Sequence, residues 1–92
     1  MSSTTSIRRP LLARYARYRW DAIREQHQLV FPEGVLVLND SGAAIVQHCD
    51  GRSMDELVAA LKAEAEGDPA ADVHLFLNRL AAKGLVRDAA RS

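Results

Sequence analysis

The side chains best suited to chemistry in this sequence are three histidines and one cysteine, namely His27, His48, His74 and Cys49. A zinc site or a nucleophilic catalyst needs several such groups to converge, and their spacing matches no ligand pattern such as HExxH or CxxC. His48 and Cys49 are adjacent on an expected helix, so their side chains point to different faces. Cys49 falls on the apolar stripe of that helix, which favours a small core residue over a reactive thiol. We therefore expect neither a metal site nor a cofactor.

Other catalytic patterns are also missing from the sequence. It has no Ser/His/Asp arrangement, no glycine-rich phosphate loop and no pair of carboxylates that a cleft could hold. The chain has 92 residues, which fits one small domain and is too short to enclose a substrate pocket of useful size. We expect a protein that is not an enzyme, with a disordered polar tail over residues 1–9 and a single domain over residues 10–88.

The cysteine count and the lengths of the apolar runs predict the cellular location of the protein. A lone cysteine excludes an intramolecular disulfide. The longest run of large apolar residues is Val35–Leu38, which is far shorter than the ~20 residues that a membrane helix needs. The first ten residues carry charge but no apolar stretch of signal-peptide length. These features predict a soluble cytoplasmic protein that does not contact a membrane.

The charges of the chain balance overall but are unevenly distributed. Residues 1–26 hold six arginines against two acids, a net charge of +4, and the remainder holds six bases against ten acids, a net charge of −4. A basic front and an acidic back are compatible with a nucleic-acid-binding arm, contact with an acidic peptide, or self-complementary assembly. They are equally compatible with arginines that only solvate an N-terminal ribbon.

Three short antiparallel strands are predicted in the first half of the chain, over 18–23, 27–31 and 35–38. Alternating polar and apolar residues support the first two, and the turn signal Pro32-Glu33-Gly34 separates the second from the third. The third strand is apolar on both faces, whereas a strand with one face on a core should alternate. Its second face must therefore be covered by a helix, a subunit or an extended guest chain.

Three helices are predicted in the second half of the chain. Asn39-Asp40-Ser41 offers cap oxygens for the first helix, and the capping box Ser53–Glu56 opens the second. Asp68-Pro69 caps and opens the third helix, which is expected to end near Lys83. Strands followed by helices indicate an α+β fold, a small three-stranded antiparallel sheet followed by three helices. The short glycine turn between the last two helices makes this arrangement winged helix-turn-helix-like.

A winged-helix fold raises DNA binding as the alternative function, with the third helix in the major groove. The first residues of that helix, Asp68–Leu77, include two aspartates but no arginine, lysine, asparagine or glutamine. Base readout uses those missing donors, and phosphates repel a negatively charged helix end. We therefore expect no nucleic-acid partner.

A set of motifs occurs in a specific order along the chain, namely Arg19-Trp20-Asp21, Leu29–Gly34, Leu36–Asn39, Ala43–Val46, Cys49-Asp50-Gly51, Asp72-Val73 and Phe76–Leu80. Any one of them alone is a weak signal, but the set closely resembles the PqqD family of pyrroloquinoline quinone (PQQ) biosynthesis. The resemblance covers roughly residues 10 to 87. It departs from the family at Phe31, where members often carry tyrosine, and this loss of a hydroxyl should leave the packing intact.

The resemblance implies a peptide chaperone, a recognition element of the kind found in ribosomal-peptide modifying enzymes. Proteins like this bind the precursor peptide PqqA and present it to the radical SAM enzyme PqqE. In such elements the leader peptide adds as a strand to the third strand and lies in a groove beside the third helix. Carried over by position, the peptide-binding residues are Val35, Leu36, Val37 and Leu38 on the strand, with Leu77 as an apolar wall and His74 and Arg79 at opposite margins of the helix stripe.

Two questions stay open at this point. Periodicity does not tell which margin of the third helix faces the groove. The unpaired strand could also mediate a homodimer, including one formed by exchange of the N-terminal ribbon between copies.

Overall fold

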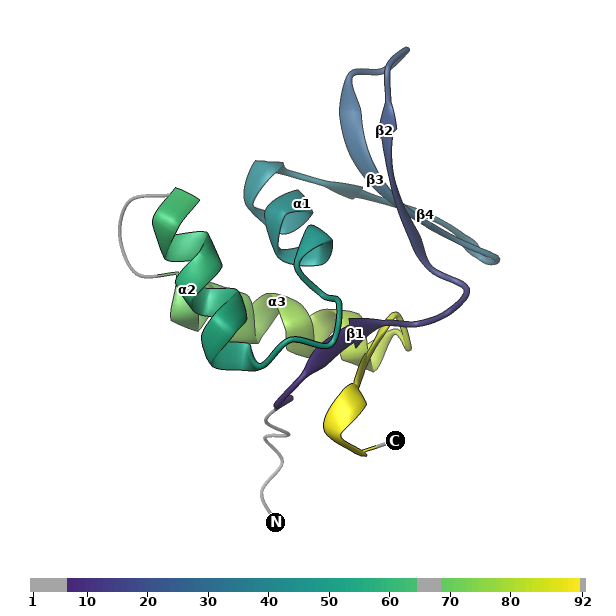
Figure 1. Ribbon diagram of the computed structural model, residues 1–92. Helices are drawn as coiled ribbons and strands as arrows, with labels where there is room; N and C mark the ends of the chain where they lie inside the picture. Colours follow the sequence, from purple (N-terminus) through teal and green to yellow (C-terminus); the bar gives the residue numbers. More distant parts are fainter. Residues whose placement is uncertain (1–6, 65–68, 92) are drawn as a thin grey trace.

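Two sheets and three helices form an α+β fold in the computed structural model, which describes residues 7–64 and 69–91. Figure 1 shows the helices grouped together, a three-stranded sheet extending beyond them, and a short two-stranded sheet near the ends of the chain. The predicted fold class is confirmed. No helix in the described part of the chain combines the length and the apolar character that a membrane span requires.

The three predicted strands form one antiparallel sheet in the order β2-β3-β4. They are β2 (Arg17–Asp21), β3 (Gln26–Phe31) and β4 (Gly34–Leu38). The first strand ends at Asp21 rather than at residue 23, because the turn begins there. The Asp21 carboxylate accepts hydrogen bonds from the backbone N–H groups of Ile23 and Arg24, at 3.0 and 3.2 Å, and these bonds close the turn.

Each of the three predicted helices is present. They are α1 (Asp40–Gln47), α2 (Met54–Glu64) and α3 (Ala70–Ala82). The Asn39 side chain caps α1 by accepting a hydrogen bond from the Gly42 N–H at 2.7 Å. Ser53 and Glu56 form the predicted capping box of α2, since the Glu56 carboxylate accepts the Ser53 N–H at 2.9 Å and the Ser53 hydroxyl accepts the Glu56 N–H at 3.1 Å. The cap predicted at Asp68 lies outside the described residues.

A second sheet is present that the sequence analysis does not predict. β1 (Pro10–Leu12) pairs antiparallel with β5 (Val86–Asp88), and a short 3-10 turn, Ala89–Arg91, follows. This sheet ties the start of the described chain to its end. Strands of three residues, so far apart in the sequence, leave no alternation long enough to detect.

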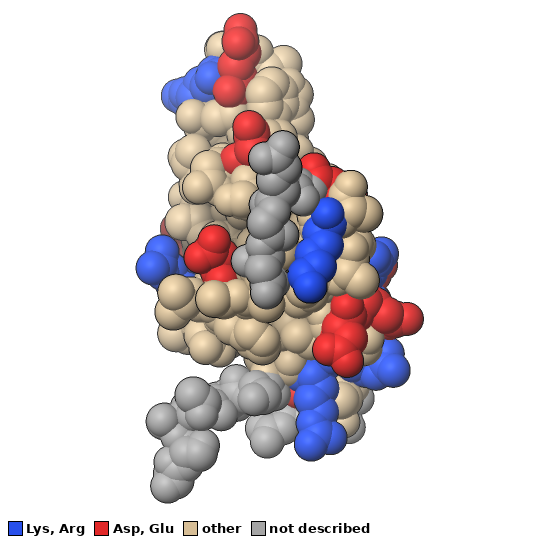
Figure 2. All heavy atoms as spheres, turned by 90° about the vertical axis from the view of Figure 1, so that its left-hand side faces the viewer, with Lys and Arg blue, Asp and Glu red and all other residues tan. Residues whose placement is uncertain are grey.

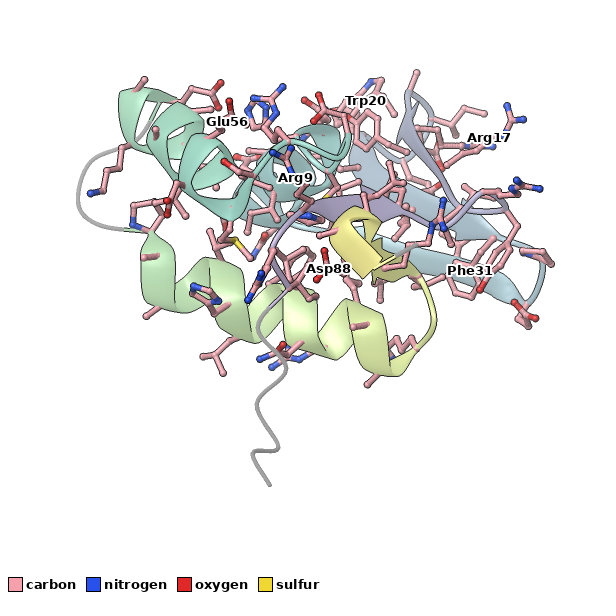
Figure 3. All side chains as sticks on the ribbon, turned by 60° about the horizontal axis from the view of Figure 1, so that its bottom comes forward. Arg9, Arg17, Trp20, Phe31, Glu56 and Asp88 are labelled. Atoms are coloured by element: carbon pink, nitrogen blue, oxygen red, sulfur yellow. The ribbon has the colours of Figure 1, made fainter. Side chains whose placement is uncertain are left out.

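The residues just before β1 are packed against the domain. Ile7 is buried, and the backbone N–H groups of Arg8 and Arg9 donate to the Asp88 carboxylate at 3.1 and 3.0 Å. Figure 3 labels Arg9 and Asp88 at this junction. Of the tail expected to be disordered, residues 1–6 lie outside the described residues, whereas residues 7–9 are folded onto the sheet.

The core lies between the inner face of the three-stranded sheet and the helices. Its largest fully buried aliphatic side chains are Leu29, Leu57, Leu77, Leu80, Leu85, Val46 and Val73. Cys49 belongs to this core, as predicted, and its thiol donates to the Ile45 carbonyl at 3.2 Å. Burial raises the pKa of the Cys49 thiol to about 12. The thiol is therefore protonated at neutral pH and has little nucleophilic character.

Candidate functional site

β4 forms one edge of the three-stranded sheet. It pairs with β3 on one side, and no other strand in the described ranges pairs with it on the other. Only two residues separate the paired Phe31 and Gly34, so this closing pair must share both backbone hydrogen bonds. Because such bonding alternates along an antiparallel ladder, Val35 and Val37 direct their N–H and C=O groups away from β3. The edge therefore offers two donors and two acceptors to an added strand.

The side chains of β4 divide between the two faces of the sheet. Leu36 and Leu38 face the core, and Leu38 is only 5% exposed. Val35 and Val37 face the other side, where they are 52% and 57% exposed. The strand is thus apolar on both faces, as the sequence indicates. The second face, which was expected to be covered, is open to solvent in the described chain.

A groove of about 460 Å³ runs beside β4, between the start of α1 and α3. Leu36, Val37 and Leu38 form its strand wall. The helix wall consists of side chains spaced three or four residues apart, namely Asp72, Leu75, Phe76, Arg79, Leu80 and Lys83. Residues with this spacing share one face of a helix. The groove therefore follows α3 alongside the open edge of the sheet.

Gly42 lets α1 close one end of this groove. A Cβ at this position would lie 3.2 Å from the Phe76 ring, which is tighter than ordinary packing allows. Glycine at position 42 therefore lets the Phe76 ring approach the first turn of α1 more closely than it could with a Cβ there. This close contact brings the ring to the end of the groove that borders α1.

Four of the seven predicted site residues line the groove: Leu36, Val37, Leu38 and Arg79. Val35 belongs to the same open edge but faces the other side of the sheet. There it lines a second hollow, of about 480 Å³, together with Val30, Val37 and several polar side chains. The strand part of the predicted site is thus one continuous edge with two differently exposed faces.

The other two predicted residues of the third helix lie away from the groove. Leu77 is 1% exposed and packs in the core rather than on the groove wall. His74 is exposed on α3 and is not among the residues that line the groove. Of the two margins considered for α3, the one that carries Arg79 therefore faces the groove.

Of the six residues of the helix wall the predicted site contains only Arg79, and it misses Asp72, Leu75, Phe76, Leu80 and Lys83. Leu75 is 65% exposed, an unusual position for a leucine on a helix of a small domain. The available signal was that Leu75 lies outside the stripe formed by the buried residues Val73, Leu77 and Leu80. A large apolar side chain off the core stripe indicates a second apolar contact surface.

The three histidines belong to different elements: His27 to β3, His48 to the end of α1 and His74 to α3. His27 is bonded to the Tyr18 hydroxyl at 2.7 Å and to Asp40 at 3.1 Å, while His48 lies 3.3 Å from Glu64. No group of three or more His, Cys, Asp or Glu side chains in the described residues is arranged to hold a metal ion. The His27 contacts join β2, β3 and the start of α1, so they help to hold these elements in place beside the site.

The described residues at the start of α3 carry an acidic charge. The acidic residue in the first turn of α3 is Asp72, and the helix has no side-chain cap among the described residues. Figure 2 views the molecule from the side that carries α2, and it shows basic and acidic side chains mixed over this face. Affinity for nucleic acid depends on clustered basic side chains, and this face does not present such a cluster.

The chain is similar to one protein family and to relatives whose names state a ligand. The family model Coenzyme PQQ synthesis protein D (PqqD) matches residues 26–86, which include β3, β4 and the three helices. A PqqA binding protein of Azotobacter vinelandii is 46% identical over 63 residues, 67% of this chain and 68% of that protein. A PqqA binding protein of Rhodopseudomonas palustris (strain HaA2) is 36% identical over 91 residues, 95% of this chain and 89% of that protein.

A solved structure shares the fold. It is the solution NMR structure of the PqqD truncation of Methylobacterium extorquens PqqCD, described as a functional and stand-alone recognition element for ribosomally synthesized and post-translationally modified peptides. The two structures superpose with a TM-score of 0.72 at 30% sequence identity, over 86% of this chain and 88% of the other.

Proposed function

Because this chain belongs to the PqqD family, we propose that it binds the precursor peptide PqqA in the biosynthesis of PQQ, as a fourth strand on the edge of β4. The observation that carries the proposal is this edge, where Val35 and Val37 direct backbone groups outward beside the groove along α3. The names of the relatives support PqqA as the ligand. The shared fold supports a peptide-recognition element.

In strand addition, backbone hydrogen bonds supply affinity, and side-chain contacts supply selectivity among peptides. The backbone groups of Val35 and Val37 bond the backbone of the guest whatever its sequence. Side chains on one face of the guest enter the groove and contact Leu36, Leu38 and Phe76, and this apolar contact selects among peptides. Side chains on the other face of the guest lie beside the exposed valines, where a second protein can reach them.

In this proposal the protein is a chaperone rather than an enzyme, and it delivers PqqA to the radical SAM enzyme PqqE. A guest held at a sheet edge keeps one face and both ends exposed, which a carrier requires because the modifying enzyme must reach the bound peptide. The delivery is proposed to take place in the cytoplasm, where ribosomal peptides are made.

A second copy of the chain is a competitor for the same edge. An apolar edge strand can pair with its equivalent in another molecule, with or without exchange of the N-terminal ribbon. A homodimer of this kind occupies the outward groups of Val35 and Val37. Added PqqA should therefore shift the dimer toward monomer, which light scattering measures. A dimer that persists while PqqA binds would show that the two do not share the edge.

The proposed function is tested by titrating the protein with synthetic PqqA and, separately, with duplex DNA. Calorimetry gives the affinities, and backbone amide shifts give the position of the ligand. We expect PqqA to bind and to shift the amides of residues 35–38 and of the groove face of α3. Absence of PqqA binding, or shifts confined to β2, would overturn the proposal, and tight DNA binding would support the alternative. Delivery is tested by PqqE turnover of PqqA, which should rise when the protein is added.

A further inference from the structure

The groove beside β4 has opposite charges at its two ends. Asp72 lies in the first turn of α3, and Arg79 and Lys83 follow seven and eleven residues later on the same groove wall. All three residues are exposed. Their side chains make no ion pair or hydrogen bond with any residue that the structure describes. Their charges are therefore available to a ligand in the groove.

The acidic end of the groove lies at the end of β4, and the basic end lies toward its start. Asp72 lines the groove together with Ser41 and Gly42, in the first turn of the helix that directly follows β4. Figure 1 shows that β4 and α3 run in opposite directions. Arg79 and Lys83, further along α3, therefore lie toward the hairpin at which β4 begins.

Helix dipoles weaken this charge separation without reversing it. The N-termini of α1 and α3 each contribute roughly half a positive charge at the acidic end, and the C-terminus of α3 contributes roughly half a negative charge at the basic end. The acidic end holds the full charge of Asp72, whose exposed carboxylate lines the groove there. The basic end holds the two full charges of Arg79 and Lys83 and stays positive, so the difference between the two ends keeps its direction, with the Asp72 carboxylate as the charged group that a basic guest side chain can reach.

The distances between these charges along α3 match the spacing of charged residues four positions apart in an extended guest peptide. At a rise of 1.5 Å per residue, Asp72 is about 10 Å along the helix from Arg79 and about 16 Å from Lys83. In an extended guest, residues four positions apart are separated by about 14 Å and point to the same face. The residue midway between them also faces the groove, where it meets the apolar side chains of Leu75 and Phe76.

We infer that the groove selects a guest in which a basic and an acidic residue lie four positions apart with an apolar residue midway between them. The inference rests on the proposed peptide-binding function and adds the charge order and direction of the guest. All pairs in the three-stranded sheet are antiparallel, and an antiparallel guest runs from the Asp72 end of the groove to the Lys83 end. The basic residue, which faces Asp72, therefore comes first in the guest sequence.

The test uses two synthetic peptides of identical composition and identical flanks, one with Lys-x-Val-x-Glu at its centre and the other with Glu-x-Val-x-Lys. Fluorescence anisotropy should show that the wild-type protein binds the basic-first peptide about tenfold more tightly, and that added salt reduces the difference. In the variant D72K/R79E/K83E the preference should invert. Equal affinities in both proteins, or no binding of either peptide by a protein that binds PqqA, would overturn the inference.

A matched variant separates the local effect from net charge. D55K/R14E/R87E changes the net charge by the same amount at exposed positions outside the groove, and it should keep the wild-type preference. Loss of the preference in this control would mean that overall charge sets it, which also overturns the inference. Thermal melts followed by circular dichroism establish that both variants are folded.

Two further measurements test, separately, the direction of the guest in the groove and the proposed peptide-binding function. A nitroxide at the N-terminus of the basic-first peptide should broaden the amide signals near Asp72, and broadening near Lys83 instead would overturn the assigned direction. PqqA titrated into the wild-type protein tests the proposed function itself. If PqqA binds while the two synthetic peptides are not distinguished, the charge order fails and the peptide-binding function stands. If PqqA does not bind, the function fails first.

Discussion

The three-stranded sheet has two edges, β2 and β4, and the difference between them indicates what keeps one edge available. β2 contains Arg17, Arg19 and Trp20, so charged and bulky side chains flank its rim. β4 consists of glycine, valine and leucine alone. Charged side chains on an edge strand oppose pairing with a further strand, whereas an apolar edge allows it. The backbone alone does not distinguish the two edges, because neither is paired on its outer side by a described strand.

The neighbours of the two strands add to this difference. The Trp20 ring packs edge-on against His27, with the ring centroids 4.9 Å apart, and the Asp21 carboxylate closes the turn at the end of β2. β4 instead borders the groove along α3, where a guest side chain can be buried. An edge is therefore open to a guest when its own side chains permit pairing and a neighbouring helix offers apolar contact.

The largest effect is expected from a proline on the β4 edge. Val37→Pro removes an outward N–H, which contributes ~1 kcal/mol as a hydrogen bond, and its ring obstructs the guest. We expect PqqA binding to weaken about thirtyfold, which corresponds to ~2 kcal/mol. The fold should persist, because this N–H does not bond β3 and proline is tolerated on edge strands. Calorimetry gives the affinity and circular dichroism verifies the fold.

The matched control places proline on the other edge. By the alternation of the β2–β3 ladder, the Trp20 N–H also points outward. Trp20→Pro should leave PqqA affinity within about twofold of the wild type, as expected for a change outside the binding edge. If this variant loses binding and Val37→Pro does not, the guest pairs with β2 and the assignment of the edges is wrong.

A smaller effect is expected from the groove wall. Leu75→Asp replaces an exposed leucine that lines the groove, so it should weaken PqqA binding about tenfold, or ~1.4 kcal/mol, with little change in Tm. Leu77→Ala, two residues away, should show the opposite behaviour. It empties a core position and should cost ~2–5 kcal/mol of folding free energy, with normal affinity for the molecules that remain folded. Tm and Kd measured on both variants separate the groove face of α3 from its core face.

The smallest effect is expected at the end of β2, where the contribution of Asp21 to stability should depend on pH. The backbone N–H of Arg24 donates to the Asp21 carboxylate and holds the pKa of Asp21 below its ordinary value of 3.8. A pKa lowered by folding stabilises the protein above that ordinary value, and the stabilisation is lost as pH falls through the folded-state pKa. Asp21→Asn should therefore lower Tm by a few degrees at pH 7, and the difference from the wild type should shrink under acidic conditions. PqqA affinity at pH 7 should not change, and a large loss would show that β2 takes part in binding.

The sequence was sufficient for the parts of the fold with local signals. Alternation and the Pro32-Glu33-Gly34 turn located the strands, and the Ser53–Glu56 capping box located the start of α2. The β1–β5 sheet was missed because each strand has three residues and its partner lies at the other end of the chain. The strand part of the site followed from an apolar edge that does not alternate.

The helix part of the site was harder to predict, because it depends on the rotation of α3 about its own axis. Leu77 and Phe76 are neighbours in one apolar run, yet the first is buried in the core and the second borders the groove. A rotation of one residue exchanges their environments, and periodicity alone does not fix it. The same ambiguity left the roles of His74 and Arg79 undecided, and only the packing against β4 resolves which of them faces the groove.

Amide hydrogen exchange with and without PqqA shows whether the guest pairs with β4. Exchange of the Val35 and Val37 amides should slow at least about tenfold when PqqA is bound, because their N–H groups become hydrogen bonded to the guest. Exchange of the Tyr18 and Trp20 amides, on the other edge, should not change. Protection of the β2 amides with unchanged exchange at Val35 and Val37 would contradict the assignment of β4 as the guest's partner.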